Sequence, residues 1–139
     1  MIASVESAGV LFSAIENTNG RELWNTDGTE GGTVVLLSGG LYDSFDGGLV
    51  EHRGAVYFAF REASTGRELW TTDGTPARTR IVKDIDPGPN GSVSSLVSFG
   101  AELYFQAVGH SDVGADAPPS HPSRRAGRSV SALTKIGKA

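Results

Sequence analysis

A ten-residue segment occurs twice in this chain of 139 residues, and the duplication constrains the fold more than any other feature. The segment reads Gly-Arg-Glu-Leu-Trp-Asn-Thr-Asp-Gly-Thr from Gly20 and Gly-Arg-Glu-Leu-Trp-Thr-Thr-Asp-Gly-Thr from Gly66. Nine of the ten positions are identical at an offset of 46 residues, and Thr33 and Thr79 extend the match. A repeat of this length indicates units of supersecondary structure that bury their apolar faces by stacking on one another.

A second repeated piece lies upstream of the first and indicates β-strands. It reads Val-Leu-Phe-Ser-Ala from Val10, Val-Tyr-Phe-Ala-Phe from Val56 and Leu-Tyr-Phe-Gln-Ala from Leu103. β-Branched and aromatic residues of this kind are enriched in strands. The units therefore run from about 10 to 55 and from about 56 to 102, with a third begun at 103.

Each unit has the composition of about four short strands, which is the content of one β-propeller blade. The Asp-Gly pairs at Asp27 and Asp73 are flanked by strand-like residues, which predicts tight hairpin turns of type I′. No segment shows sustained helical periodicity. We therefore predict an all-β fold of antiparallel β-meander repeats that resemble about two blades of a β-propeller.

The last 30 residues differ from the rest in composition. All 11 aromatic residues lie within 1–109, whereas 110–139 is rich in Pro, Ser, Gly, Ala and Arg. Such a segment has too few apolar groups for a packed core, so we predict a disordered tail from 110 to 139. The third unit also lacks its Glu-Leu-Trp segment. A frameshift near codon 108 would explain that loss, and a natural disordered tail is the alternative.

Composition excludes several classes of protein. The net charge is −4, which argues against nucleic-acid binding. The absence of cysteine excludes disulfides and cysteine-ligated metals. No apolar run is long enough for a transmembrane helix, so we expect no membrane insertion. The first residues lack the basic and apolar regions of a signal peptide.

The repeated motif is the first candidate site, because it contains carboxylates and tryptophans. A residue that recurs in every unit serves a need that every unit has, which in stacked repeats is packing and turn formation. We therefore predict that Trp24 and Trp70 fill the space between adjacent sheets in matching environments, and that no residue is catalytic. The structural motif residues are Glu22, Leu23, Trp24, Asp27, Gly28, Thr29, Glu68, Leu69, Trp70, Asp73, Gly74 and Thr75.

A metal site is the second candidate. Asp84, Asp86 and Asn90 have the alternating oxygen ligands of a calcium loop, but the twelfth position is Ser95 instead of a bidentate Glu. A strand end followed by a Pro-Gly turn is the favoured interpretation, with weak calcium binding as the alternative and no other cofactor expected. The three histidines, His52, His110 and His121, have no partner at metal-ligand spacing and are interpreted as loop residues.

The motif Glu-Leu-Trp-x-Thr-Asp-Gly-Thr resembles that of the ELWxxDGT repeat family over roughly residues 8–109. These are large bacterial proteins, often called hyalin-like, whose tandem copies resemble β-propellers. In this chain Arg78 replaces the glycine that usually precedes the last threonine. The first copy also has Leu36-Leu37-Ser38-Gly39 where the second has Val82-Lys83-Asp84-Ile85.

The resemblance implies an exported or cell-surface protein and transfers no catalytic activity. We therefore expect a non-enzymatic structural or binding module that is a fragment of a larger protein. Its partners would be other repeats of the same type and a protein or carbohydrate ligand. The alternatives are a fragment of a propeller hydrolase and a calcium-binding adhesion module.

Overall fold

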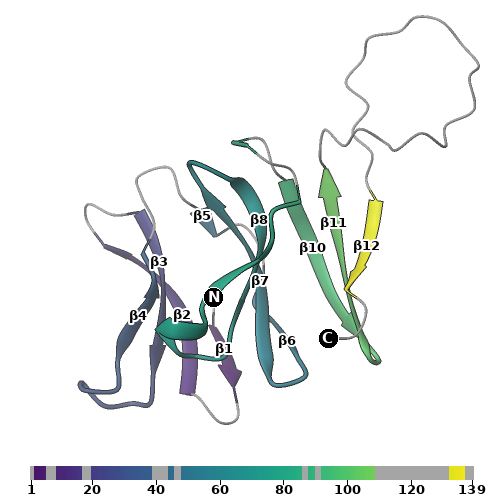
Figure 1. Ribbon diagram of the computed structural model, residues 1–139. Helices are drawn as coiled ribbons and strands as arrows, with labels where there is room; N and C mark the ends of the chain where they lie inside the picture. Colours follow the sequence, from purple (N-terminus) through teal and green to yellow (C-terminus); the bar gives the residue numbers. More distant parts are fainter. Residues whose placement is uncertain are drawn as a thin grey trace, which may run out of the picture.

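The computed structural model describes residues 2–5, 9–16, 20–38, 44–45, 48–85, 88–89, 92–108 and 132–136. Within them the chain forms strands and one 3₁₀ turn, which confirms the predicted all-β class. The strands form three antiparallel groups that lie side by side, here called the first, second and third layers (Figure 1).

The first layer is a four-stranded meander in the order β1 (Ile2–Val5), β2 (Gly9–Glu16), β3 (Gly20–Thr26) and β4 (Val34–Leu37). The second layer contains β5 (Ser44–Phe45), β6 (Val50–His52), β7 (Ala55–Glu62), β8 (Gly66–Thr72) and β9 (Arg80–Lys83), with the 3₁₀ turn Pro76–Arg78 before β9. The third layer contains β10 (Ser92–Phe99), β11 (Glu102–Val108) and β12 (Ala132–Ile136). A single parallel pair, Ser92 opposite Arg67, joins the second and third layers.

The sequence repeat is out of phase with the layers. Position 56, the predicted start of the second unit, lies within β7, and β6 pairs with β7 in the same meander. The β6–β7 hairpin closes through Arg53 and Gly54, whose φ angles are +54° and +79°. Positive φ at both loop positions is the requirement of a type I′ turn. The sequence did not reveal this turn, because arginine is not typical of such positions.

In the third layer, a segment that is distant in the sequence takes the position of the missing Glu-Leu-Trp strand. In the first two layers Phe12 lies opposite Trp24 and Phe58 opposite Trp70, and in the third Phe105 lies opposite Thr134. The structure therefore differs from the predicted disorder at Ala132–Ile136, where β12 pairs with the edge of β11. An unpaired edge offers free backbone donors and acceptors to any extended segment. The remaining residues of the predicted tail lie outside the described residues.

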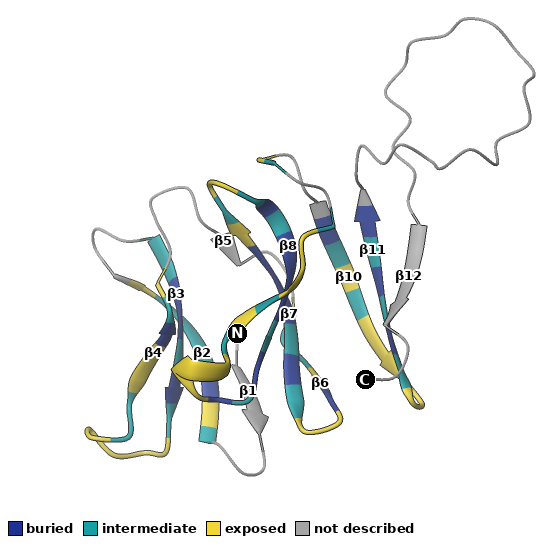
Figure 2. Cartoon of the chain, viewed as in Figure 1, coloured by how far each residue is buried: buried dark blue, intermediate teal, exposed yellow. Residues whose placement is uncertain are grey.

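Two apolar cores lie between the three layers. Because successive side chains of a strand point to opposite faces, the second layer contributes to both cores. The first core joins the first and second layers, and its buried members are Leu11, Leu23, Leu36, Val56, Phe58, Phe60 and Trp70. The second core joins the second and third layers, and its buried members are Ala59, Leu69, Val93, Phe105 and Ala107. We call the face of a layer that points toward the next layer along the chain its front, and the opposite face its back. Buried residues are concentrated in β7 and β8 of the middle layer (Figure 2).

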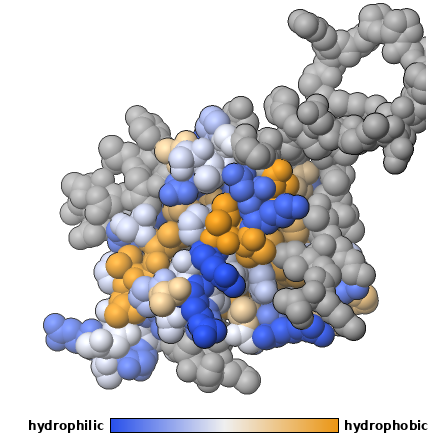
Figure 3. Space-filling model, in the orientation of Figure 1, coloured by the Kyte–Doolittle hydropathy of each residue, from blue (hydrophilic) through white to orange (hydrophobic). Residues whose placement is uncertain are grey.

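Outside these cores some hydrophobic residues remain exposed. In the view of Figure 3 hydrophobic groups appear over the first layer and near the centre of the molecule, between hydrophilic residues. The large hydrophobic residues that are exposed are Val10, Ile15, Val34, Val35, Val82, Val97 and Phe99.

Candidate functional site

The repeated Asp-Gly pair opens a seven-residue loop and not a two-residue hairpin turn. β3 ends at Thr26 and β4 begins at Val34, and the same spacing separates β8 from β9. Within the two loops only Gly28 and Gly74 have positive φ, +91° and +93°. The prediction of a type I′ turn at Asp27-Gly28 and Asp73-Gly74 is therefore wrong. The reason is that side chains of the motif hold a wider loop.

The aspartate organises the first half of each loop. In the first copy, Oδ1 of Asp27 accepts hydrogen bonds from the backbone N–H of Thr29 at 2.9 Å and from its hydroxyl at 2.7 Å. In the second copy, Asp73 accepts the same two bonds from Thr75 at 3.0 and 2.6 Å. Local carboxylate-to-backbone bonds of this kind stabilise turns.

Paired threonines close the base of each loop. The hydroxyls of Thr26 and Thr33 lie 2.7 Å apart, and those of Thr72 and Thr79 also lie 2.7 Å apart. Thr33 donates its hydroxyl proton to the carbonyl of Thr29 at 2.6 Å. Since a hydroxyl has one proton, Thr26 must be the donor in the threonine pair. Thr26 also accepts from the N–H of Gly28, which completes a continuous chain of hydrogen bonds.

These bonds change the acidity of the aspartates. The hydroxyl of Thr29 lowers the pKa of Asp27 below its ordinary value of 3.8, and the hydroxyl of Thr75 does the same to the pKa of Asp73. Hydrogen bonds to the charged form of a carboxyl group favour ionisation. Both aspartates are therefore carboxylates with a structural role at neutral pH.

The motif glutamates are buried and bind the chain that follows the return strand. Glu22 accepts hydrogen bonds from the indole N–H of Trp24 at 3.2 Å and from the hydroxyl of Ser38 at 2.8 Å. Glu68 accepts from the backbone N–H of Ile85 at 2.8 Å. Glu22 thus links β3 to the residue after β4, and Glu68 links β8 to a residue after β9.

The two tryptophans have the same register but different surroundings. Trp70 is buried in the first core, where it packs edge-on against Phe60 with centroids 5.6 Å apart. Trp24 is half-buried and stacks on Phe12 with centroids 6.4 Å apart. Trp70 lies between two layers as expected, whereas the expectation of matching environments is wrong. Leu23 and Leu69 are buried, in the first and second cores respectively.

The remaining candidate residues lie apart from one another or outside the described residues. Asp84 is exposed, while Asp86 and Asn90 lie outside the described residues, so the calcium loop stays a prediction. In the part of the chain that the structure describes, no group of three His, Asp or Glu residues could hold a metal ion.

His52 differs from its prediction as a loop residue. It lies at the end of β6, is buried, and its Nδ1 lies 2.8 Å from the hydroxyl of Ser98 in the third layer. The other two histidines, His110 and His121, lie outside the described residues.

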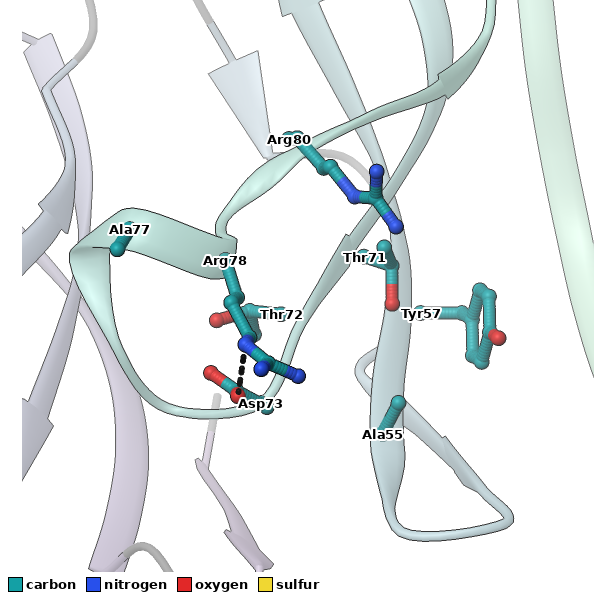
Figure 4. A pocket seen from close by; sticks show the side chains of 8 residues that line it. All are labelled: Ala55, Tyr57, Thr71, Thr72, Asp73, Ala77, Arg78 and Arg80. Carbon is teal, nitrogen blue, oxygen red and sulfur yellow. Dashed lines mark ion pairs between the residues drawn. The ribbon is translucent and has the colours of Figure 1, made fainter.

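A pocket that the sequence analysis missed lies beside the second loop (Figure 4). Its volume is about 410 Å³, and its lining residues are Ala55, Tyr57, Thr71, Thr72, Asp73, Ala77, Arg78 and Arg80. Arg78 lies 3.6 Å from Asp73. The signal in the sequence lies in positions at which the second copy departs from the first, such as Arg78 in place of Gly32.

Comparison with models of protein families, with curated proteins and with solved structures finds no match to this chain. Among the described residues, none of the helical structure has the length and apolar character needed to cross a bilayer.

Proposed function

We propose that the chain is a non-enzymatic structural repeat module whose layers stack face to face, and that its partner is a further repeat of the same type. The observation that carries this proposal is a difference between two equivalent faces. The back of the second layer is covered by the first layer, whereas the back of the first layer is not covered by described residues.

The same positions differ sharply in burial between the two layers. Val56 is 0% exposed, and its equivalent Val10 is 38% exposed. Phe58 is fully buried, while its equivalent Phe12 is half-buried. Val35, opposite Trp24 on the same face, is 39% exposed. An apolar sheet face of this kind indicates an interaction site.

The interface between the first and second layers indicates the chemistry of a partner for the back of the first layer. The front of the first layer supplies Leu11, Leu23 and Leu36 to the back of the second. A further repeat packed on the back of the first layer would place the equivalents of Leu11, Leu23 and Leu36 against Phe12 and Trp24. The motif supports a structural role as well, because its carboxylates are engaged in loop and strand contacts. The resemblance to exported repeat proteins supports a surface or extracellular location as part of this proposal.

Sedimentation of the full chain over a range of concentrations tests the proposal. Without another repeat in solution, the exposed back face is expected to cause self-association. Replacing Val10 and Val35 together by lysine should weaken the association at least about tenfold, since each tenfold corresponds to about 1.4 kcal/mol.

Ile15→Lys is the matched control, because Ile15 is 69% exposed and its strand register places it on the opposite face. It should leave association unchanged. A wild-type chain that stays monomeric, or equal weakening by the control, would overturn the proposal.

A further inference from the structure

The pocket lies on the front of the second layer, at its loop end. Tyr57 lies opposite Thr71, and Thr71 lies opposite Arg80, so these three residues form a row across β7, β8 and β9. Figure 4 shows the guanidinium of Arg80 directed toward Thr71, and that of Arg78 beside Asp73. Tyr57 thus stands at one end of the row and the arginines at the other.

Four of the six polar side chains that line the pocket, those of Tyr57, Thr71, Arg78 and Arg80, belong to the second unit alone. The equivalent row in the first unit is Leu11, Asn25 and Val34. Gly32 is the equivalent of Arg78. Residues shared by both units hold the two loops and link the strands to the residues that follow them. The residues that differ gather around one cavity, which indicates a role that only this unit has.

The equivalent place in the first unit is covered by protein. Asn25 donates a hydrogen bond from its side-chain N–H to the carbonyl of Gly74, in the loop of the second layer, at 2.9 Å. The chain has no third Asp-Gly-Thr segment that could cover Thr71 in the same way. The pocket is therefore the counterpart, in the second unit, of a loop-binding position, with arginine and tyrosine among its lining residues.

The pocket presents positive charge on an acidic body. Residues 1–109 contain 7 basic and 14 acidic residues. Among the described residues Arg80 makes no ion pair, and the side chain of Arg78 is 78% exposed beside its partner Asp73. An exposed ion pair of this kind contributes little to stability, so it does not prevent Arg78 from binding an anion. Two guanidinium groups favour a planar carboxylate, which they can bind through paired N–H donors.

The rest of the lining favours a ligand that also carries hydroxyl groups. Thr71 donates its hydroxyl proton to the carbonyl of Val56 at 3.2 Å, so toward a ligand its oxygen accepts. The carboxylate of Asp73 is a second acceptor. Ala55, Tyr57 and Ala77 also line the pocket and add apolar atoms to its wall. We propose that this pocket binds a carboxylate-bearing sugar of the uronic acid class. The site is independent of the stacking face proposed above.

Calorimetric titration of the full chain with glucuronate tests the proposal. Saturable heat is expected with glucuronate, and none with glucose at the same concentration, because glucose lacks the carboxylate. Sodium sulfate is the third ligand, because it supplies an anion without a ring or hydroxyl donors. Absence of heat with glucuronate, or equal binding of glucose or sulfate, would overturn the proposal.

Two substitutions convert the pocket to the residues of the first unit, namely Arg80→Val and Arg78→Gly. Each should weaken glucuronate binding at least about tenfold, and Arg80→Lys should weaken it less than Arg80→Val because it keeps the charge. Arg61→Val is the matched control, since Arg61 is an exposed arginine of the same layer outside the pocket. Far-ultraviolet circular dichroism checks whether each variant is folded. Unchanged binding in folded Arg80→Val or Arg80→Lys would contradict the site, and self-association should be the same in all four variants.

Discussion

At the scale of single residues, burial separates the two copies of the motif tryptophan. Trp70 is buried between two layers, whereas Trp24 is half-buried and lies on the back of the first layer, which no described layer covers. The indole N–H of Trp24 donates to Glu22, while the indole nitrogen of Trp70 is buried without an acceptor among the described residues. Identical residues in identical register therefore contribute differently to stability.

Truncation of Trp70 is expected to destabilise the chain severely. Trp70→Ala removes a buried aromatic side chain, which typically lowers the free energy of unfolding by about 3–5 kcal/mol. Trp24→Ala should cost less, because part of its ring is already in contact with solvent. Urea denaturation followed by circular dichroism measures both. Trp70→Phe should be milder than Trp70→Ala, since it keeps apolar area and removes a donor that lacks an acceptor. Equal losses in the two alanine variants would contradict this account.

The loop aspartates predict a loss of stability in acid. The pKa values of Asp27 and Asp73 are lowered by folding, so their contribution is complete above the unfolded value of 3.8. It is lost progressively as the pH falls below 3.8 and through the lower folded pKa values, because the unfolded chain then binds more protons. The urea concentration at the midpoint of unfolding should therefore be lower at pH 2.5 than at pH 5.

The double variant Asp27→Asn and Asp73→Asn supplies the control for this pH dependence. It should be less stable than the wild type at pH 5, and its midpoint should change less between the two pH values. An identical pH dependence in the variant would show that other carboxyl groups are responsible.

At the scale of elements, one sequence motif forms two versions of the same loop. Both loops share the aspartate bonds and the threonine pair, but only the second contains a 3₁₀ turn, at Pro76–Arg78. A Cβ atom on Gly32 would overlap the carboxylate of Asp27. The second loop carries Arg78 at that position, and there the backbone N–H of Arg78 donates to the carbonyl of Thr75. In the first loop, the N–H of Gly32 instead donates to the hydroxyl of Thr29.

This difference predicts the effect of two neighbouring glycine substitutions. Gly32→Ala should displace Asp27 and lower the free energy of unfolding by about 1–3 kcal/mol, as overpacking does. Gly31→Ala is the matched control, because a Cβ there meets nothing within 4 Å. Urea denaturation distinguishes them. Equal stability of the two variants would show that the position of Asp27 does not require a glycine at position 32.

At the scale of the whole molecule, stability depends on how many layer faces are covered. The second layer contributes residues to both cores and has one exposed large hydrophobic residue among those described, Val82, whereas the other six lie on the flanking layers. Stacked repeats obtain much of their stability from contacts between neighbours. An array this short gains few such contacts.

We therefore expect the chain to melt below about 60 °C, the upper part of the usual mesophilic range. Because association covers apolar faces, the melting temperature should also rise with protein concentration. Differential scanning calorimetry at two concentrations measures both effects. A monomer with a cooperative transition above that temperature would contradict this expectation.

The sequence by itself determined the local structure of the chain. Strands, their antiparallel order and the place of each loop follow from side chains that interact with near neighbours. The bonds of Asp27 and Thr33 all reach partners within seven residues. Even there the predicted turn type was wrong, because the sequence pattern does not show whether backbone or side-chain bonds close a loop.

Only the tertiary structure decided which equivalent residues differ in burial and where a pocket forms. Trp24 and Trp70 share a motif, and their difference arises because a neighbouring layer covers one of them. The pairing of β12 with β11 joins segments far apart in the chain, and Tyr57, Thr71 and Arg80 come together only across three strands. Such contacts depend on which faces and edges meet in space, and periodicity along the sequence does not specify that.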